Sequence, residues 1–441
     1  MAIHRRLFLF LLILLPTQLG FHFWPAWAYL LGRKIDYLSP TIFLTDLVLI
    51  ALLAAWWIQS AAKNRNHPVI RIPGRLVIIA LAILGAVTVN VLHSANQEVA
   101  LYKWMKILEF AGLGWYIVRT RPVIKEMIDA LSVGILYSSG LAITQFILQH
   151  SAGGLFWFLG ERAFALDTPG ISRFNFCSPF ISTCELLLRP YGTFPHPNVL
   201  GGFLATSLPF IIYALIMSFQ TKQHTMHRYY YWVVLILGYI ALALTLSRSA
   251  WSIGAAILIG IMGILLRSFS SRSHSGNVPF TVFLIVISFF VISLITMTGI
   301  FQPSLSDESV VRRITLSNVA ISLWRQSPVV GIGLGNFLVA LPQSTAGRQI
   351  NFLQPVHNIY LLLLSETGLL GLCLFFAAIW IRVKNLIRHI HVQPFSSAHI
   401  FFLSLCGVLM AGFADHYPLT LQQGQLWIVV LFSFAFTSEN R

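Results

Sequence analysis

The sequence predicts an all-α polytopic membrane protein, a single domain over 1–441 with about 12 transmembrane helices. Of the 441 residues, 57% are hydrophobic and only 10% are charged, and apolar segments long enough to cross a bilayer recur along the whole chain. The net charge of +15 would suit a nucleic-acid partner, but no basic domain stands outside the apolar segments to bind one. We therefore expect no nucleic acid, and interpret most of the charge as a signal of membrane orientation.

The candidate spans follow one another from the first residues to the last. They lie at about 7–24, 42–60, 76–93, 99–118, 127–149, 198–219, 230–247, 250–266, 280–300, 358–381, 399–414 and 425–437. The last is short, and the span at 99–118 is interrupted by Lys103, Lys106 and Glu109. The first follows basic residues as a signal peptide does, but no small-residue cleavage site follows it, so we expect a retained helix.

Orientation follows from the positions of the basic residues. Of the 29 lysines and arginines, 17 lie in the termini and short connections on one side of the predicted bundle. Short basic loops face the cytoplasm, so both termini are predicted to be cytoplasmic. The opposite side has two long connections, at about 150–197 and 301–357. Long loops in compact proteins are often functional, and we expect these two to form a cap over the outer end of the bundle.

The second long loop contains a predicted helix at 309–326. Val311, Ile314, Val319 and Leu323 recur at helical spacing and form an apolar stripe. The other faces of this helix carry arginines, namely Arg312, Arg313 and Arg325. The sequence therefore places positive charge on the cap.

The four cysteines divide by context. Cys373 and Cys406 lie inside apolar runs, where a free thiol behaves as a small hydrophobe. Cys177 and Cys184 lie in the first long loop and form a disulfide if that loop faces an oxidising compartment. Two partly buried free thiols are the alternative, because spacing alone does not supply the required geometry.

The most informative segment is 189–198, which reads Arg-Pro-Tyr-Gly-Thr-Phe-Pro-His-Pro-Asn. Its prolines remove backbone donors and favour extended conformations before them, and Gly192 favours a turn. A rigid loop is therefore expected to present Arg189, His196 and Asn198 at the membrane surface. An ordered connector between two helices is the alternative.

Two further motifs lie on the same predicted side. Leu-Ser-Arg-Ser-Ala-Trp at 246–251 places Arg248 in a tight turn, where it either meets an anion or snorkels to the interface. Gly-Ile-Gly-Leu-Gly-Asn-Phe at 331–337 has the wrong spacing for a dinucleotide fingerprint. Its glycines are instead expected to let the backbone pack closely or wrap a ligand.

The last motif is His357-Asn358 at the start of a span, with Gly368 and Gly371 beyond it. Histidine exchanges a proton near neutral pH, but a histidine at a helix start also serves as a cap. Glu366 would lie about 13 Å deeper along the helix and is interpreted as structural. The run 415–417, Asp-His-Tyr, ends the next span on the same side, and Asp415 is expected to orient the site.

Together these motifs resemble a known family. Arg-x-x-Gly-Thr-Phe-x-His-Pro-Asn, Leu-Ser-Arg-Ser, Gly-x-Gly-x-Gly-Asn-Phe and His-Asn-x9-Gly-x-x-Gly occur in an order similar to the O-antigen ligase and Wzy-type polymerase family, over roughly 185–375. The resemblance implies a bacterial inner-membrane enzyme with a periplasmic site. It further implies transfer of a glycan from an undecaprenyl-diphosphate-linked donor to a hydroxyl of a glycan, a lipid A core or a protein.

The same resemblance gives each candidate residue a role. Arg189 and Arg248 would stabilise the departing diphosphate, and His357 matches the family's catalytic histidine and would activate the acceptor. The remaining candidates are expected to bind substrate, and they are His196, Asn198, Arg312, Arg313, Arg325, Asn358 and Asp415. Neither a cofactor nor a metal is expected, since no acidic pair with ligand spacing lies on the outer side.

Two alternatives remain open. Within the family, the chain could be a polysaccharide polymerase rather than a ligase. Outside it, a flippase for the same lipid-linked glycans would have a similar hydropathy profile, although a transporter would more naturally show repeated halves and ionisable groups near the midplane.

Overall fold

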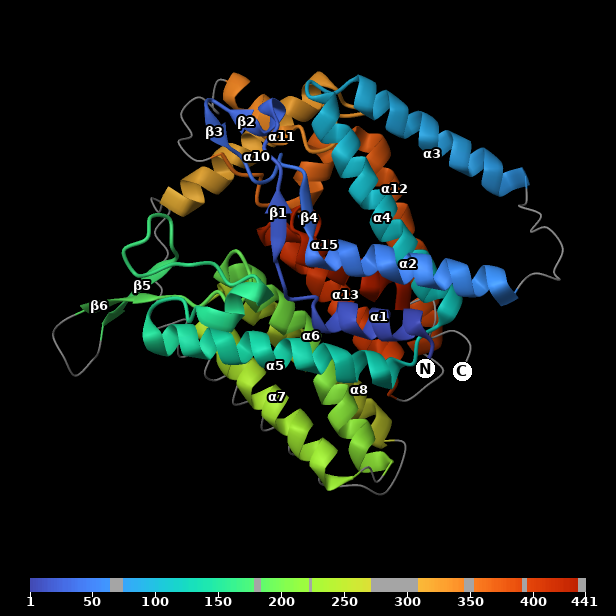
Figure 1. The fold of residues 1–441 in the computed structure, drawn as a ribbon, viewed down its shortest axis with the longest axis vertical. Coiled ribbons are helices and arrows are strands. Elements are labelled where there is room, and N and C mark those ends of the chain that lie inside the picture. Colours follow the sequence, from blue (N-terminus) through green and yellow to red (C-terminus); the bar gives the residue numbers. More distant parts are fainter. Residues whose placement is uncertain are drawn as a thin grey trace.

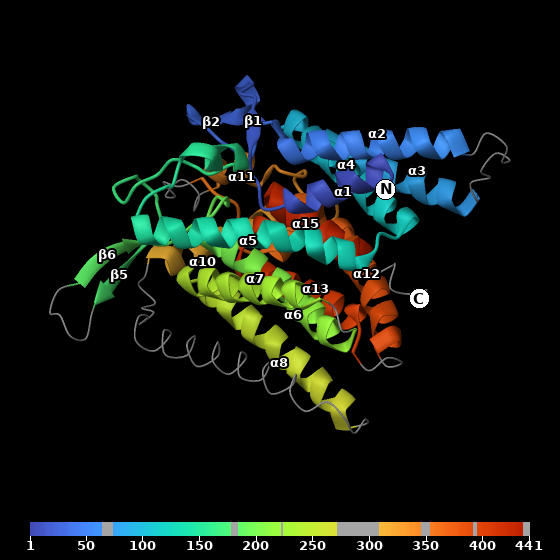
Figure 2. The same ribbon diagram turned by 60° about the horizontal axis from the view of Figure 1, so that its bottom comes forward.

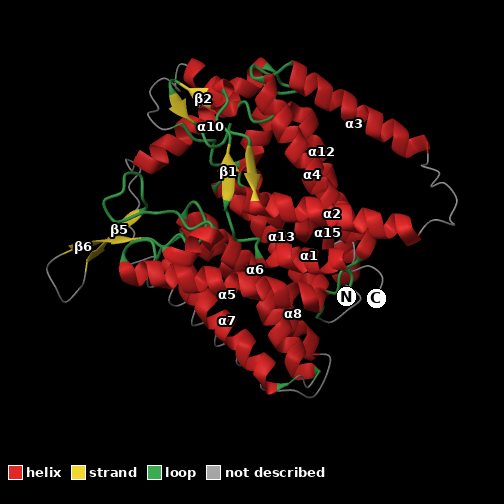
Figure 3. Cartoon of the chain, viewed as in Figure 1, coloured by secondary structure: helices red, strands yellow, loops and turns green. Residues whose placement is uncertain are grey.

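In a computed structural model, the structure describes residues 1–63, 74–177, 184–221, 224–270, 308–344, 353–390 and 395–434. These parts form a bundle of long helices, beside which the strands are few and short (Figures 1 and 3). The helices are α1 (Ile3–Ile13), α2 (Leu44–Lys63), α3 (Gly74–Leu92), α4 (Gln97–Thr120), α5 (Ile124–Leu148), α6 (Pro197–Gln220), α7 (Thr225–Leu244), α8 (Arg248–Ser270), α10 (Glu308–Gln326), α11 (Phe337–Ala340), α12 (Ile359–Ile390), α13 (Ser397–Ala414), α14 (Tyr417–Thr420) and α15 (Gln422–Phe434). Three antiparallel pairs complete the fold, namely β1 (Gly20–His22) with β4 (Thr41–Phe43), β2 (Tyr29–Leu30) with β3 (Arg33–Lys34), and β5 (Arg173–Cys177) with β6 (Cys184–Leu188).

Seven helices of this described part are long and apolar enough to cross a membrane: α2, α5, α6, α7, α8, α12 and α13. The predicted class, an all-α polytopic membrane protein, is confirmed. The number of twelve spans stays a prediction, because the expected span at 280–300 lies outside the described residues and α4 carries charges.

Helix α6 is the centre of the bundle. In its most apolar stretch, 89% of the residues are buried, and the helix packs against α5, α7, α8 and α13. In Figure 2 the helices α5, α6 and α7 run side by side, while β1, β2, β5, β6 and α10 gather at one end and the N-terminus lies at the other. We call the end with the strands the cap end. The proline-rich loop leads directly into α6, so residues at the start of α6 are held by the most buried helix of the protein.

The N-terminal segment differs from its prediction. Helix α1 ends at Ile13 after 11 residues, or about 16 Å, which is about half of a bilayer core. The expected span at 7–24 is therefore wrong. Beyond Pro16 the chain leaves the helix, and β1 pairs with β4 at the start of α2.

The segment after α1 is apolar because it is buried against protein, Leu14 and Leu15 in the bundle core and later residues at the cap end. Ala28, Ile35 and Leu38 are buried in one cluster with residues of α10, α11 and α12. The N-terminal segment thus meets the described part of the second predicted loop in this cluster, and Gln18 donates to the carbonyl of Gly160 in the first. A cap formed by the two loops over the outer end of the bundle stays a prediction. In sequence, burial against protein and burial in lipid give the same apolar signal.

The helix predicted at 309–326 is confirmed as α10, but its apolar stripe is not the expected one. Val319 and Leu323 are buried as predicted, together with Leu316 and Ala320, whereas Val311 and Ile314 are 51% and 54% exposed. The buried face is thus shifted towards the second half of the helix, which packs against α12.

Helix α12 is broken at Gly368, whose φ of +64° interrupts the helical backbone. The glycine-rich loop fills the break: the amide of Ile332 donates to the carbonyl of Ser365, and the amide of Leu369 donates to that of Pro328. A side chain at Gly331 would collide with the backbone of Glu366. The glycines of the loop therefore allow close backbone packing, as predicted, and the break is satisfied by protein groups.

The first long loop contains the β5–β6 hairpin. Cys177 and Cys184 lie directly opposite each other in its register, Cys184 is disulfide-bonded, and Cys373 and Cys406 are free. These observations agree with the predicted Cys177–Cys184 bridge.

Candidate active site

A cavity of about 1180 Å³ lies beneath the cap, where the N-terminal segment, the first long loop, the α7–α8 turn, α10 and the start of α14 converge. The basic side chains that line it are Lys103, Lys106, Arg162, Arg189, Arg248, Arg312 and Arg313. The carboxylates that line it are Asp36, Glu161 and Asp415. Seven cations thus face three anions, and the cavity favours an anionic ligand.

Arg189 is anchored in three directions. Its Nε donates to the Thr245 carbonyl at 2.8 Å, Nη1 to Ser172 Oγ at 2.9 Å and Nη2 to Asn198 Oδ1 at 2.8 Å. Burial and then the nearby Arg248 lower the pKa of Arg189 to about 10, so it stays a cation at neutral pH. A guanidinium has five N–H donors, which leaves two for a ligand in the cavity.

The loop that carries Arg189 is held by a residue that the sequence did not suggest. Gln145 of α5 is fully buried; its Oε1 accepts from the amides of Tyr191 and Gly192, and its Nε2 donates to the Gly192 carbonyl. Gly192 has a φ of +57°, a conformation that favours glycine. The rigidity predicted from the prolines therefore also depends on a buried amide.

Arg248 opens α8 and lines the same cavity. The turn before it is strained, since Leu246 has a φ of +49°, which is rare for a non-glycine residue. Gly201 of α6 packs against Thr245, Ser247 and Ala250. This packing holds the strained turn and keeps the N-terminus of α8, with Arg248, at the cavity.

Helix α10 contributes two of its three predicted arginines to the cavity. Arg312 and Arg313 line the cavity, and Arg313 Nη1 donates to the Ala414 carbonyl at 2.7 Å, one residue before Asp415. Arg325 is exposed near the other end of the helix and does not line the cavity. The structure therefore brings Arg312 and Arg313 to the site and leaves Arg325 outside it.

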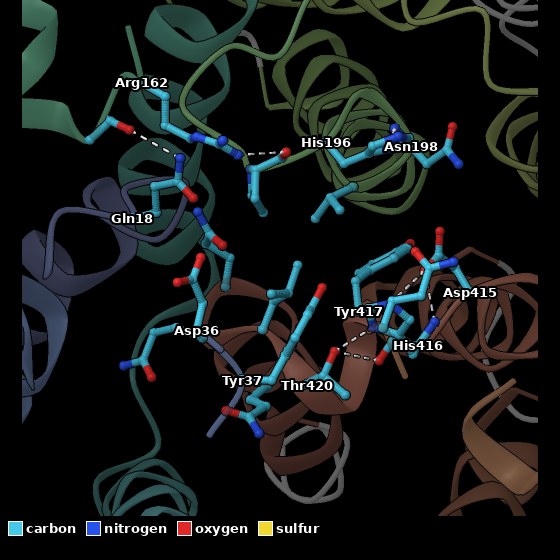
Figure 4. A pocket seen from close by; sticks show the side chains of 18 of the residues that line it. Gln18, Asp36, Tyr37, Arg162, His196, Asn198, Asp415, His416, Tyr417 and Thr420 are labelled. Atoms are coloured by element: carbon cyan, nitrogen blue, oxygen red, sulfur yellow. Dashed lines mark hydrogen bonds and ion pairs between the residues drawn. The ribbon is translucent and has the colours of Figure 1, made fainter. Parts of the chain in front are cut away.

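His357 meets Asp415 and His416 at the cavity wall. Nδ1 of His357 lies 3.4 Å from Oδ1 of Asp415, a distance that suits an ion pair. The geometry of this contact is not that of a hydrogen bond, and Nδ1 has no other hydrogen-bond partner among the described residues. The ring of His357 lies 5.1 Å from that of His416. His416 is itself fixed, because its Nδ1 lies 2.7 Å from Thr420 Oγ1 and its amide donates to Asp415 (Figure 4).

Burial and charge set the protonation of this cluster. Burial raises the pKa of Asp415, but contact with His357 and the neighbouring histidines outweighs burial and holds that pKa well below its usual range. Burial lowers the pKa of His416 to about 4 against the raising effect of Asp415. At neutral pH the cluster therefore contains an anionic Asp415 and a neutral His416.

This cluster also has a spacing that the sequence did not reveal. One ligand atom each from His357, Asp415 and His416 lies within 4.8 Å of the other two, close enough to hold a metal ion. The surrounding arginines oppose a dication. His416 Nδ1 bonds to Thr420, which leaves Nε2, 4.0 Å from Asp415 Oδ1, as the nitrogen available to an ion. The side chains of His357, Asp415 and His416 could hold a metal ion, whereas the arginines of the cavity favour an anion.

The remaining predicted residues divide between the cavity and helix caps. His196 and Asn198 line the cavity (Figure 4), and His196 also caps α6, since its Nδ1 accepts from the Asn198 amide at 3.1 Å. Burial, and then Arg189, lowers the pKa of His196 to about 4, so it is neutral. Asn358 caps α12 by accepting from the amides of Tyr360 and Leu361 and does not line the cavity.

Several cavity residues come from regions where the sequence gave no hint of a site. Gln18, Asp36 and Tyr37 belong to the N-terminal segment that was expected to be partly in the membrane. Lys103 and Lys106 come from α4, where their charges interrupt the predicted span at 99–118. Lys106 lies 2.7 Å from Asp46 and 2.8 Å from Glu109, so its charge is largely compensated.

Comparison with known proteins identifies the domain. Residues 232–376 match the family described as O-Antigen ligase, a segment that includes Arg248, Arg312, Arg313 and His357. This segment is similar to O-antigen ligases. The family named from the motifs is therefore confirmed.

One characterised relative extends the comparison. The chain is 25% identical over 216 residues to a protein of Acinetobacter baylyi named general O-oligosaccharyltransferase. The match covers 44% of this chain and 36% of the relative, so the chain spans about a third of that protein's length. The family model and the relative are thus both named for the joining or transfer of glycans.

Proposed function

We propose that this protein transfers a glycan from a polyprenyl-diphosphate-linked donor, such as an undecaprenyl diphosphate, to an acceptor hydroxyl. The observation that carries the proposal is the convergence of Arg189, Arg248, Arg312 and Arg313 on one cavity with His357 and Asp415. The O-antigen ligase domain and the relative named as an O-oligosaccharyltransferase support glycan transfer to oxygen. The acceptor is a glycan, a lipid A core or a protein.

The arginines bind the diphosphate and stabilise it as it leaves. When the bond between the anomeric carbon and the diphosphate oxygen breaks, its electron pair goes to that oxygen, and negative charge builds up there. The two unused N–H groups of Arg189 and the guanidinium of Arg248 are suited to bind it with charge-assisted hydrogen bonds. The three anchors of Arg189 keep it positioned before the donor arrives, which lowers the cost of reorganisation.

His357 accepts the proton of the acceptor hydroxyl. The hydroxyl oxygen forms the new bond to the anomeric carbon, and its proton passes to the imidazole. With an N–H at Nδ1 directed at Asp415, Nε2 is the nitrogen left to take the proton, a tautomer that we assign from the 3.4 Å contact. Asp415 is anionic and stabilises the imidazolium that forms.

We propose that the reaction needs no metal ion. The guanidinium groups supply the positive charge that a cation would otherwise provide. A chelator should leave transfer unchanged, and added Mg²⁺, Mn²⁺ or Zn²⁺ should not raise it. A loss of transfer with a chelator that one of these ions restores would assign His357, Asp415 and His416 to a metal site instead.

We place the protein in the bacterial inner membrane, with both termini cytoplasmic and the cavity facing the periplasm. The basic residues of the short connections support this orientation. The proposed function is tested with purified protein in detergent or vesicles, a defined undecaprenyl-diphosphate-linked oligosaccharide and candidate acceptors. Covalent transfer of the oligosaccharide, with release of the lipid diphosphate, is the expected result.

A further inference from the structure

The wall of the cavity formed by the N-terminal segment differs in charge from the rest. Between Gln18 and Phe43, the residues that line the cavity include one charged side chain, Asp36. The arginines that suit a diphosphate come from the first long loop, the α7–α8 turn and α10. In Figure 4, Gln18 and Asp36 lie across the cavity from Asn198 and Asp415, while the ring of Tyr37 approaches His416. The N-terminal segment thus contributes one carboxylate and no lysine or arginine to the cavity wall.

Asp36 acts on His22 and Tyr37 only through its charge. It is exposed to the cavity, and no described side chain or amide hydrogen-bonds or pairs with it. The other two cavity carboxylates are used: Glu161 accepts from Gln145 and from the amides of Ala152 and Gly153, and Asp415 meets the histidines. A carboxylate at this position repels a diphosphate and can accept hydrogen bonds from ligand hydroxyls.

Neighbouring side chains give this wall the polarity of a sugar site. Gln18 uses its Nε2 to bond to the Gly160 carbonyl at 3.1 Å, which leaves its Oε1 as an acceptor. Burial raises the pKa of the Tyr37 phenol, so this group keeps its proton and can donate. A sugar carries adjacent hydroxyls that both donate and accept, and mixed polar groups beside an aromatic ring match that pattern.

The same wall reaches the proposed base. The ring of Tyr37 lies edge-on to the ring of His416, with centroids 5.5 Å apart, and His416 contacts His357. A ligand held by Asp36 and Tyr37 would therefore lie beside the group that takes the proton. This is the position in which a second substrate must bind.

We propose that Gln18, Asp36 and Tyr37 form the acceptor subsite and that it binds a hydroxyl-rich sugar, an assignment that rests on the proposed function. Asp36 accepts hydrogen bonds from hydroxyls next to the one that reacts, and Tyr37 sets the distance of the sugar from His357. The alternative acceptor, a serine or threonine of a peptide, carries a single hydroxyl and would leave most of these groups unused.

The experiment measures acceptor and donor binding separately. A core oligosaccharide freed of fatty acids is one acceptor probe, and a peptide with serine and threonine is the other. In Asp36→Asn the Kd and the KM for the oligosaccharide should rise about 10- to 100-fold, the effect of losing a hydrogen bond to a charged group. Donor affinity should stay within about twofold. Asp167→Asn, an exposed carboxylate of the first long loop outside the cavity, is the matched control and should bind both substrates normally.

Oligosaccharide binding is measured without donor, so failure of the subsite and failure of the proposed function are distinguishable. Unchanged oligosaccharide affinity in Asp36→Asn would overturn the subsite even where the wild type transfers glycan. Equal loss of donor and acceptor affinity, or transfer to the peptide alone, would also overturn it. If Asp36→Asn weakens oligosaccharide binding but the wild-type protein transfers no glycan, the proposed reaction is overturned instead.

Discussion

Replacing Arg189 with lysine keeps a positive charge in the cavity but removes the planar fork of the guanidinium. In the structure this fork reaches Thr245, Ser172 and Asn198 with three different nitrogens. An ammonium group is a compact charge at the end of a flexible chain and cannot make those three contacts while also facing a ligand. Arg189→Lys therefore separates the effect of charge from that of geometry.

The expected magnitude follows from the bonds that are lost. A hydrogen bond to a charged group contributes about 1.5–3 kcal/mol, and a net loss of about 2 kcal/mol in the lysine variant corresponds to a roughly 30-fold lower rate. Arg189→Ala also loses the charge and leaves the carbonyl of Thr245 without this donor. We expect a loss of about 4 kcal/mol there, or roughly 1000-fold.

The assay measures transfer rate and donor affinity for purified variants, with thermal unfolding as a check on the fold. Arg173→Lys is the matched control, because Arg173 is exposed on the β5–β6 hairpin and does not line the cavity. Donor affinity should fall in both Arg189 variants and stay normal in the control. A well-folded Arg189→Lys protein with transfer within about threefold of wild type would refute the argument that the fork geometry matters.

Three further predictions concern topology, the disulfide and acid sensitivity. Reporter fusions after Ser268 and after Gln343 should report opposite sides of the membrane; the same side for both would contradict the proposed orientation. Denatured protein without reductant should show two reactive thiols, Cys184→Ser should show three, and four in the wild type would exclude a bridge. The pKa of His196 is lowered to about 4, so the unfolded chain binds a proton that the folded protein does not as the pH falls from about 6.5 to 4, and stability should fall over that range. His196→Asn keeps an N-cap acceptor without titrating, so its unfolding temperature should drop less between pH 7 and pH 5; an equal drop would show that other groups cause the acid sensitivity.

The fold class could be predicted, and several residues of the cavity could be singled out, because their signals are local. Apolar runs of sufficient length marked the spanning helices, and an arginine in a tight turn or after a proline-rich loop stood out against its surroundings. Arg189, Arg248 and His357 were found in this way, and the structure brings all three to one cavity. The family resemblance suggested the shared chemistry that we propose for them.

The errors arose where sequence does not distinguish two kinds of burial. Residues 14–24 are apolar enough for a membrane span, yet the helix ends at Ile13 and the chain continues into the cap. The same ambiguity affected α10, where Ile314 fits the helical period but is exposed. Periodicity shows that a face is apolar, whereas the position of the neighbouring elements decides whether that face is covered.

The other residues of the cavity and its supports could not be found because their positions depend on distant partners. Asp36 became a candidate only when the structure placed it across the cavity from Asp415, and Gln145 looked like an ordinary polar residue in a span. The spacing of His357, Asp415 and His416 joins positions nearly 60 residues apart. Contacts between elements that are remote in the chain leave no pattern in a single sequence.

The central claim is that His357 and the arginines catalyse glycan transfer in one cavity. Purified wild-type protein should join a defined undecaprenyl-diphosphate-linked glycan to an acceptor. His357→Ala should lower turnover by about 10²–10⁴-fold, the usual effect of losing a general base, while donor affinity stays near normal. Near-normal transfer by well-folded His357→Ala and Arg189→Ala proteins, or movement of the donor across vesicles with no transfer product, would contradict the enzyme and favour a transporter.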